Sequence, residues 1–188
     1  MTKLIVISAP SGAGKTTLCE RLLKDIKMIK LSISSTTRLP RGQETHGREY
    51  FFLKEADFKA GIERDEFAEW ALVHGNYYGT SKRFVSEAFQ DGYSVLLDID
   101  VQGAASLRKT FPKDCFSVFI SPPSLQVLEQ RLRARGTDKE ETILKRLRNA
   151  KAEMDRKNEF DLVVINDSLD RAYEELRAAV STQLSREQ

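Results

Sequence analysis

The sequence predicts an α/β domain in which helices flank a parallel sheet, and three observations support this prediction. Four short apolar runs recur along the chain, each continuously apolar, as in strands that are covered on both faces. Apolar residues at helical spacing lie between these runs, so strand and helix alternate. A glycine-rich turn ending in Gly-Lys-Thr joins the first run to the first helical segment. In such a sheet, ligands bind beyond the carboxyl ends of the strands.

The expected elements follow the chain in a simple order. Helical stripes are expected from the end of the glycine-rich turn and again over 125–132, 143–154 and 169–180. The expected strands lie at 4–7, 95–97, 118–120 and 162–165, with a weaker fifth at 31–33.

The length and composition fit one domain without a membrane segment. At 188 residues the chain suits a single domain with a sizeable core. Its 30 Lys and Arg against 28 Asp and Glu leave a net charge of +2, which is not the footprint of a nucleic-acid-binding protein. The two cysteines lack metal-ligand spacing and are interpreted as buried thiols in a reducing cytosol. No signal peptide or membrane span is found, so we expect a cytoplasmic protein with neither nucleic-acid nor membrane partners.

The turn over residues 8–17 is interpreted as a phosphate-binding loop. Gly12 and Gly14 let backbone N–H groups turn inward around phosphate oxygens, and the following helix adds its positive N-terminal end. Lys15 can reach the β- and γ-phosphates, and the Thr16 hydroxyl can bind Mg²⁺. The alternative is an ordinary strand-to-helix turn rich in glycine, but the apolar strand before it and the helical stripe after it favour the phosphate loop.

Residues 34–93 interrupt the alternation of strand and helix. A polar loop marked by proline and glycine spans 34–42, and aromatic pieces follow at 49–52 and 66–73. A further turn leads into a helix that is expected to end near Gln90. We interpret this segment as a small α+β lobe inserted after the second core strand, which closes over a second substrate.

Residues 131–148 carry seven cations and are interpreted as a helix-turn-helix lid. Arg131 and Arg135 share one face of their helix because they are four residues apart. A solvated charged face is the alternative, and it is favoured by composition alone. Beside a phosphate loop the lid is favoured, since phosphoryl transfer needs cations on the equatorial oxygens.

Two acids end a buried strand. Asp98 and Asp100 are two residues apart and should therefore point to one face, near a Mg²⁺ ion held by Thr16. Asp98 alone could instead be a strand-end cap.

Taken together, these segments resemble guanylate kinase, which transfers a phosphoryl group from ATP to GMP. The resemblance covers nearly the whole chain. It rests on the segments 9–17, 34–38 with 40–41, 47–52, Glu69, 75–79, 97–100 with 102–103, 122–124, 131–136 and 164–167. It implies a parallel P-loop kinase core sheet flanked by helices (1–33, 94–130 and 149–188), a GMP-binding α+β lobe (34–93) and a helical lid (131–148).

The resemblance also assigns roles residue by residue. Ser34, Glu69, Thr80 and Asp100 are expected around the guanine, and Arg38, Arg41, Tyr50 and Tyr78 around the GMP phosphate. The ATP site is expected to comprise Ala9, Pro10, Ser11, Gly12, Ala13, Gly14, Lys15, Thr16 and Thr17, with Asn166 near the adenine. Lys15, Arg131, Arg135 and Arg146 are the expected catalytic cations, and Thr16, Asp98 and Asp100 the expected Mg²⁺ site. Ala9 replaces the first glycine of the loop pattern, a change that leaves the phosphate-binding residues untouched.

Two alternatives remain open at this point. A guanylate-kinase-like protein-binding module would keep the fold without catalysis, although Lys15, Thr16 and the lid arginines argue for an enzyme. An enzyme of similar fold could phosphorylate another phosphate ester such as a ribose bisphosphate, although Glu69 with Ser34 favours guanine. The sequence leaves open the oligomeric state and the preference between GMP and dGMP.

Overall fold

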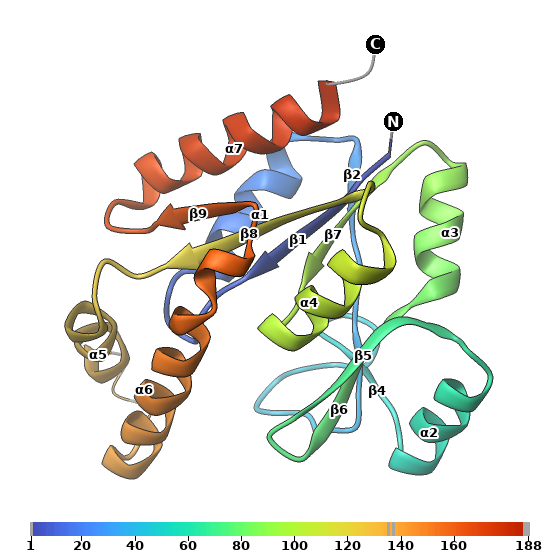
Figure 1. The fold of residues 1–188 in the computed structure, drawn as a ribbon. Coiled ribbons are helices and arrows are strands. Elements are labelled where there is room, and N and C mark those ends of the chain that lie inside the picture. Colours follow the sequence, from blue (N-terminus) through green and yellow to red (C-terminus); the bar gives the residue numbers. More distant parts are fainter. Residues whose placement is uncertain (1, 135, 137, 186–188) are drawn as a thin grey trace.

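The fold is built on a five-stranded parallel sheet with strand order β2-β7-β1-β8-β9. A computed structural model describes residues 2–134, 136 and 138–185 (Figure 1). The strands of this sheet are β1 (Leu4–Ser8), β2 (Ile29–Leu31), β7 (Ser94–Asp98), β8 (Cys115–Ser121) and β9 (Leu162–Ile165). The predicted α/β class with a parallel sheet is confirmed, and the strand runs are apolar because helices cover both faces.

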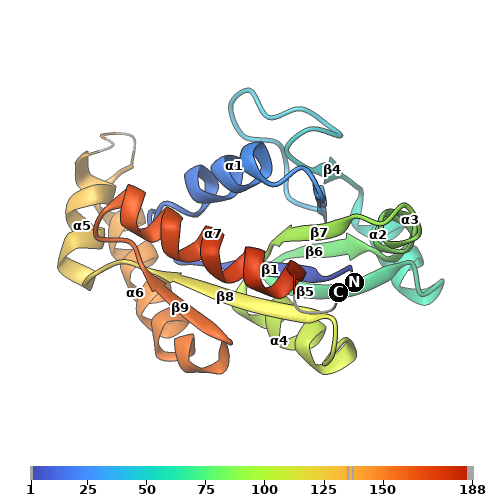
Figure 2. The same cartoon turned by 90° about the horizontal axis from the view of Figure 1, so that it is seen from above.

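Each face of the sheet has its own helices. On one face, α1 (Lys15–Asp25) and α7 (Leu169–Ser185) pack against alternate residues such as Ile5, Ile7 and Val164. On the other face, α3 (Lys82–Gln90) and α4 (Val101–Thr110) pack against Leu4 and Val6. Figures 1 and 2 show α1 and α7 on the side of the sheet opposite α4.

The weak fifth strand is placed differently from the prediction. The expected run was 31–33, but β2 covers Ile29–Leu31, where Ile29 is buried and pairs with Ser94 of β7. The chain then leaves the ladder after one further hydrogen bond, from Ser32 N to Leu96 O at 2.9 Å. The difference arises because pairing with β7 decides where this short strand lies.

A second, four-stranded sheet forms the inserted lobe, with strand order β4-β3-β6-β5. Its elements are β3 (Ser35–Thr36), β4 (Phe51–Phe52), α2 (Glu55–Glu63), β5 (Phe67–Val73) and β6 (Asn76–Ser81). Stacked aromatic rings hold it together: the ring of Phe58 lies 4.4 Å from that of Phe67 and 5.4 Å from that of Tyr77. A register shift between Phe67 and Glu69 marks a β-bulge, a feature that re-aims side chains.

Two further helices, α5 (Leu125–Ala134) and α6 (Glu140–Asp155), form a third unit with its own small core. Leu128, Leu132, Ile143 and Ala150 are buried together between them. A 3₁₀ turn, η1 (Lys157–Glu159), leads from α6 to β9. In Figure 1 the inserted lobe and the α5–α6 pair lie on opposite sides of the end of the sheet where β1 meets the glycine-rich loop.

Candidate active site

The glycine-rich loop turns sharply between β1 and α1. Gly12 and Gly14 adopt φ angles of 96° and 93°, in the left-handed region that favours glycine. A Cβ atom at Gly12 would lie 3.1 Å from both Leu128 and Leu132, and one at Gly14 would overlap the side-chain amide of Asn166. Glycine is therefore required here for the backbone angle and for close packing.

Asn166 supports this loop from the end of β9. Its side chain is buried, and its Nδ2 donates a hydrogen bond to the carbonyl oxygen of Ala13 at 2.7 Å. Its own carbonyl oxygen accepts from Arg131 Nη2 at 2.8 Å. In the structure this side chain holds the phosphate loop, and the predicted contact of Asn166 with adenine stays a prediction.

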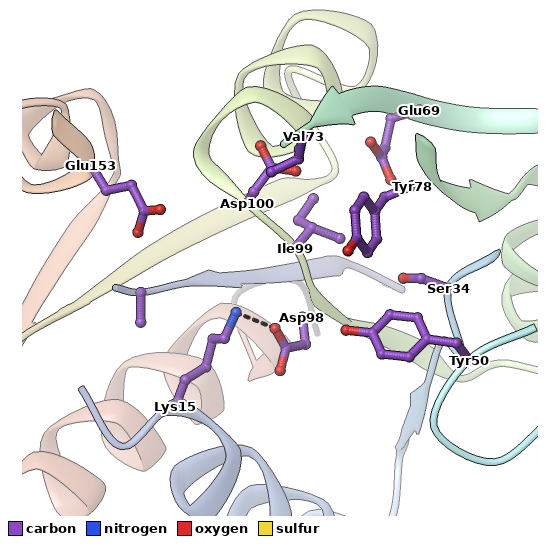
Figure 3. Close-up of a pocket in the computed structure, with 11 residues that line it drawn as sticks. Lys15, Ser34, Tyr50, Glu69, Val73, Tyr78, Asp98, Ile99, Asp100 and Glu153 are labelled. Carbon is purple, nitrogen blue, oxygen red and sulfur yellow. Dashed lines mark ion pairs between the residues drawn. The ribbon is translucent and has the colours of Figure 1, made fainter. Parts of the chain in front are cut away.

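Lys15 and Asp98 form an ion pair across the base of the cavity shown in Figure 3. Lys15 begins α1 and Asp98 ends β7, the strand beside β1. Burial by itself lowers the pKa of Lys15, but the adjacent Asp98 carboxylate outweighs it, so that the pKa is raised overall. Lys15 is therefore charged at neutral pH and positioned for an anion.

The two acids that were expected to end one strand differ in their surroundings: Asp98 is the last residue of β7, whereas Asp100 lies beyond the strand and is the N-cap of α4. Asp98 and Asp100 line the same cavity. The Asp100 carboxylate, however, caps α4 by accepting from Gln102 N at 2.7 Å and Gly103 N at 3.3 Å. Among the described residues, no group of three or more His, Cys, Asp and Glu side chains is arranged around a metal ion.

The proposed ligands nevertheless suit Mg²⁺. The Thr16 hydroxyl and the Asp98 carboxylate line one cavity with the phosphate loop. Mg²⁺ prefers oxygen ligands, and it is commonly held by one or two protein groups together with substrate phosphates and water.

The acceptor end of the cavity is built around a buried carboxylate. Glu69 is 5% exposed and accepts a 2.7 Å hydrogen bond from the Thr80 hydroxyl. Burial raises its pKa to about 7, with Asp100 contributing and the Thr80 hydrogen bond opposing. A Cβ at position 103 would lie 2.6 Å from the Glu69 carboxylate, so Gly103 makes room for it. Ser34, Tyr50 and Tyr78 line the same cavity (Figure 3).

The two arginines expected at the GMP phosphate have different environments. Arg38 is buried and forms a bidentate pair with Glu44, with N–O distances of 2.9 and 3.0 Å. Its guanidinium lies 5.2 Å from the centre of the Tyr50 ring. Arg41 is exposed and lines a cavity with Tyr78 and Arg146. The Glu44 partner was not foreseen, because a local motif does not reveal which acid an arginine pairs with.

Of the lid arginines, Arg146 reaches the phosphate loop. Its Nη1 donates to Ser11 Oγ at 3.1 Å, and its Nη2 lies 3.4 Å from Asp138 Oδ1. Arg131 is held on the carbonyl of Asn166 as described above. Arg135 was also expected to close over the transferring group, and it lies outside the described residues.

Two features of α6 were not predicted from the sequence. Glu153 lines the cavity together with Lys15, Asp100 and Glu69, and burial, with Asp100 adding and Lys15 opposing, raises its pKa to about 7. Asn149 contacts His74, with 3.1 Å between Nδ2 and Nε2, and thereby joins α6 to the turn between β5 and β6. The only signal for Glu153 was its position beside Ala150 and Met154 on the apolar stripe of the helix.

The two cysteines are free thiols and take no part in the proposed chemistry. Cys19 is buried and Cys115 is half-buried. Burial raises the pKa of each thiol to about 12, so both are unreactive at neutral pH.

Comparisons with known proteins agree over nearly the whole chain. A family model described as guanylate kinase matches residues 1–183. The guanylate kinase of Caldanaerobacter subterraneus is 49% identical over 94% of this chain and 85% of its own length. That of Dechloromonas aromatica is 52% identical over 94% of this chain and 87% of its own length. The crystal structure of guanylate kinase from Anaplasma phagocytophilum superposes with a TM-score of 0.80 at 28% identity, covering 98% of this chain and 87% of that one.

Proposed function

Because this chain belongs to the guanylate kinase family, whose members are ATP:GMP phosphotransferases, we propose the division of labour by which its cleft performs that reaction. The observation that carries the proposal is the single cavity in which Lys15 of the phosphate loop and Glu69 of the lobe both lie. One end is suited to an anionic phosphate chain and the other to a base that offers hydrogen-bond donors. The product of the transfer is GDP.

The acceptor end is proposed to select guanine through Glu69. An ionised carboxylate is only an acceptor, and guanine offers it two adjacent donors, N1–H and the 2-amino group. Thr80 orients the carboxylate, and Ser34 lies at the same end to donate to O6. Asp100 lies beside them, and its negative charge favours a base edge made of donors.

The GMP phosphate is proposed to lie among Arg41, Tyr50 and Tyr78, with Arg38 behind them. Arginine suits this task because its planar fork can form two parallel hydrogen bonds with a phosphate. Arg38 is already paired with Glu44, which fixes its guanidinium against the ring of Tyr50. Among the described residues, no side chain pairs with the exposed guanidinium of Arg41, which can turn to the substrate.

The ATP phosphates are proposed to lie in the turn from Ala9 to Thr17. Lys15 would leave Asp98 for the phosphate oxygens, which releases the Asp98 carboxylate. Thr16 and Asp98 would then hold Mg²⁺, with Asp100 nearby, and the ion when bound neutralises charge on the phosphates. Arg131, Arg135 and Arg146 would face the transferring group, so catalysis comes from positioning and charge neutralisation.

Closure of the three units is part of this proposal. The core (1–33, 94–130 and 149–188), the GMP lobe (34–93) and the lid (131–148) must bring their groups to one phosphoryl group. Closure also excludes water, which would otherwise hydrolyse ATP. No helix in the described part of the chain is long and apolar enough to cross a membrane. We propose a cytoplasmic location, as expected for an enzyme of free nucleotides.

The experiment is a coupled assay of ADP release with a panel of acceptors. GMP, AMP, CMP, UMP and a ribose bisphosphate are supplied in turn with ATP and Mg²⁺. GMP should be the preferred acceptor by orders of magnitude. Preference for the ribose bisphosphate would contradict the guanine assignment, and no turnover with any acceptor would point to a protein-binding module.

A further inference from the structure

We propose that Glu153 is a positioning residue for the acceptor nucleotide, whose ribose hydroxyls donate hydrogen bonds to its carboxylate. This inference rests on the function proposed above. It adds a third wall to the acceptor site, contributed by α6 and not by the inserted lobe.

The side chain of Glu153 extends into the cavity from the side opposite the lobe. Figure 3 shows it reaching inward from α6, across the cavity from Ser34 and Glu69. Glu153 lines the cavity that also contains Ser34 and Glu69. It lines a second cavity too, formed by the phosphate loop with Lys15 and Thr16. The carboxylate therefore lies where the two substrates must meet.

Within the described part of the chain, Glu153 has no hydrogen-bond donor of its own. Across residues 2–134, 136 and 138–185, no side chain forms a hydrogen bond or ion pair with its carboxylate. The other acids of the cavity are occupied: Asp98 by Lys15, Glu69 by Thr80, and Asp100 by the backbone N–H groups that begin α4. A half-buried carboxylate without a donor is unfavourable, so a ligand that supplies donors would be bound there.

The chemistry of the substrates leaves few candidates for this donor. Phosphates carry negative charge and would repel the carboxylate, and the donors of the guanine edge face Glu69. Both ends of the acceptor nucleotide are proposed to attach to the lobe, the base at Glu69 and the phosphate at Tyr50 and Tyr78. The ribose between them must then face away from the lobe, toward α6, and its two hydroxyls are its hydrogen-bond donors.

The test measures kcat/KM for GMP, 2′-deoxy-GMP and 3′-deoxy-GMP with the full-length chain and its Glu153→Ala variant. In the wild type, at least one deoxy analogue should be poorer than GMP by about tenfold, the size of a hydrogen bond to a charged group. In Glu153→Ala, GMP should lose that advantage, while the same analogue changes by less than about twofold. The analogue that shows this pattern identifies the hydroxyl that Glu153 accepts.

Two further variants separate this role from a structural one. Glu153→Gln keeps the size of the side chain and one acceptor oxygen, so it should retain part of the preference for GMP. Asp155→Asn removes the same charge from an exposed position on the same helix and should leave all three substrates unchanged. Circular dichroism and thermal melting confirm that each variant is folded.

The possible results are distinct. Equal losses for GMP and both analogues would overturn the inference and indicate a role in the phosphate or Mg²⁺ chemistry. An unchanged or improved activity with GMP would also overturn it, and it is the result that simple charge repulsion by Glu153 predicts. Absence of GMP turnover in the wild type would contradict the proposed function itself, and the inference with it.

Discussion

The ammonium group of Lys15 and the carboxylate of Asp98 form an ion pair at the base of the cavity between the phosphate loop and the lobe. The pair joins the first residue of α1 to the last residue of β7. Each member of the pair is opposite in charge to one part of the ATP–Mg²⁺ complex. The phosphates would bind Lys15, and the metal ion would bind Asp98. The pair thus holds both groups in place for the two parts of the nucleotide complex.

Replacing Lys15 with Met should abolish turnover and leave the protein folded. The side chain keeps a similar length, but the charge that faces the phosphates is lost, and kcat should fall by well over tenfold. Steady-state kinetics measure the loss, and far-UV circular dichroism with a melting curve checks the fold. Near-normal turnover would contradict the phosphate-loop assignment. Lys24→Met, in the last turn of the same helix, is the matched control.

Replacing Asn166 with Ala should raise the KM for ATP through the shape of the loop. The substitution removes the 2.7 Å hydrogen bond to Ala13 and opens space beside Gly14. A net hydrogen bond of about 0.5–1.5 kcal/mol corresponds to a change of roughly two- to tenfold. If Asn166 acts through the loop, ATP and a donor with another base should be affected equally. A selective loss with ATP would instead support the predicted contact with adenine.

Arg41 and Arg38 should both matter for GMP, but only Arg38 for stability as well. Arg41→Ala should raise the KM for GMP roughly ten- to a hundredfold, the effect of one charge-assisted hydrogen bond, with little change for ATP. Arg38→Ala should raise it similarly and also lower the melting temperature, because Glu44 loses its bidentate partner. Equal effects on the KM values of both substrates would place these arginines away from the GMP phosphate.

These contrasts show which parts of the site can be predicted from sequence. The phosphate loop is a local pattern, because its glycines, Lys15 and Thr16 follow one another in the sequence and together form the loop. The strands of the parallel sheet are equally local, except for the short β2, whose limits depend on its partner β7. In the lobe, β3 lies within the segment predicted as a polar loop, because its pairing with β4 and β6 makes it a strand. The pairing of Arg38 with Glu44 and the inward direction of Glu153 depend on packing between separate segments, so no local pattern contains them.

The lobe and the lid should close when both substrates bind. His74 of the lobe already contacts Asn149 of α6, the residue directly after the lid, and Arg146 of the lid already reaches Ser11. The three units must still bring their groups to one phosphoryl group, so small-angle scattering should show a smaller radius of gyration with GMP and an inert ATP analogue than with either alone. The fluorescence of Trp70, next to Glu69, should change with GMP. An unchanged scattering curve with both ligands would exclude a large closure.

The pH dependence of GMP binding should report the ionisation of Glu69. Burial raises its pKa from 4.5 to about 7, so the folded protein disfavours the charged form. The folded protein is therefore stabilised by Glu69 in full below pH 4.5, where the carboxyl is protonated. This stabilisation is lost as the pH rises to about 7. Guanine needs the ionised carboxylate, so the KM for GMP should rise by up to about tenfold for each pH unit below the pKa. Glu153 titrates in the same range, and the variant described next separates the two groups.

Replacing Glu69 with Gln should remove both this pH dependence and most of the preference for guanine. Glutamine has the same size but offers one acceptor oxygen and two N–H donors, which oppose the N1–H and 2-amino donors of guanine. The value of kcat/KM for GMP should therefore fall steeply, while the trace activity with AMP changes little or rises. A site built on buried hydrogen bonds can reject the wrong base by a factor on the order of 10⁴. The ratio of kcat/KM for GMP to that for AMP can therefore decrease by several orders of magnitude in the variant. Glu66→Gln, on an exposed residue three positions earlier, provides the control for the loss of charge. An unchanged GMP-to-AMP ratio in Glu69→Gln would remove Glu69 from the recognition of the base, and any pH dependence that remains in this variant would then belong to Glu153.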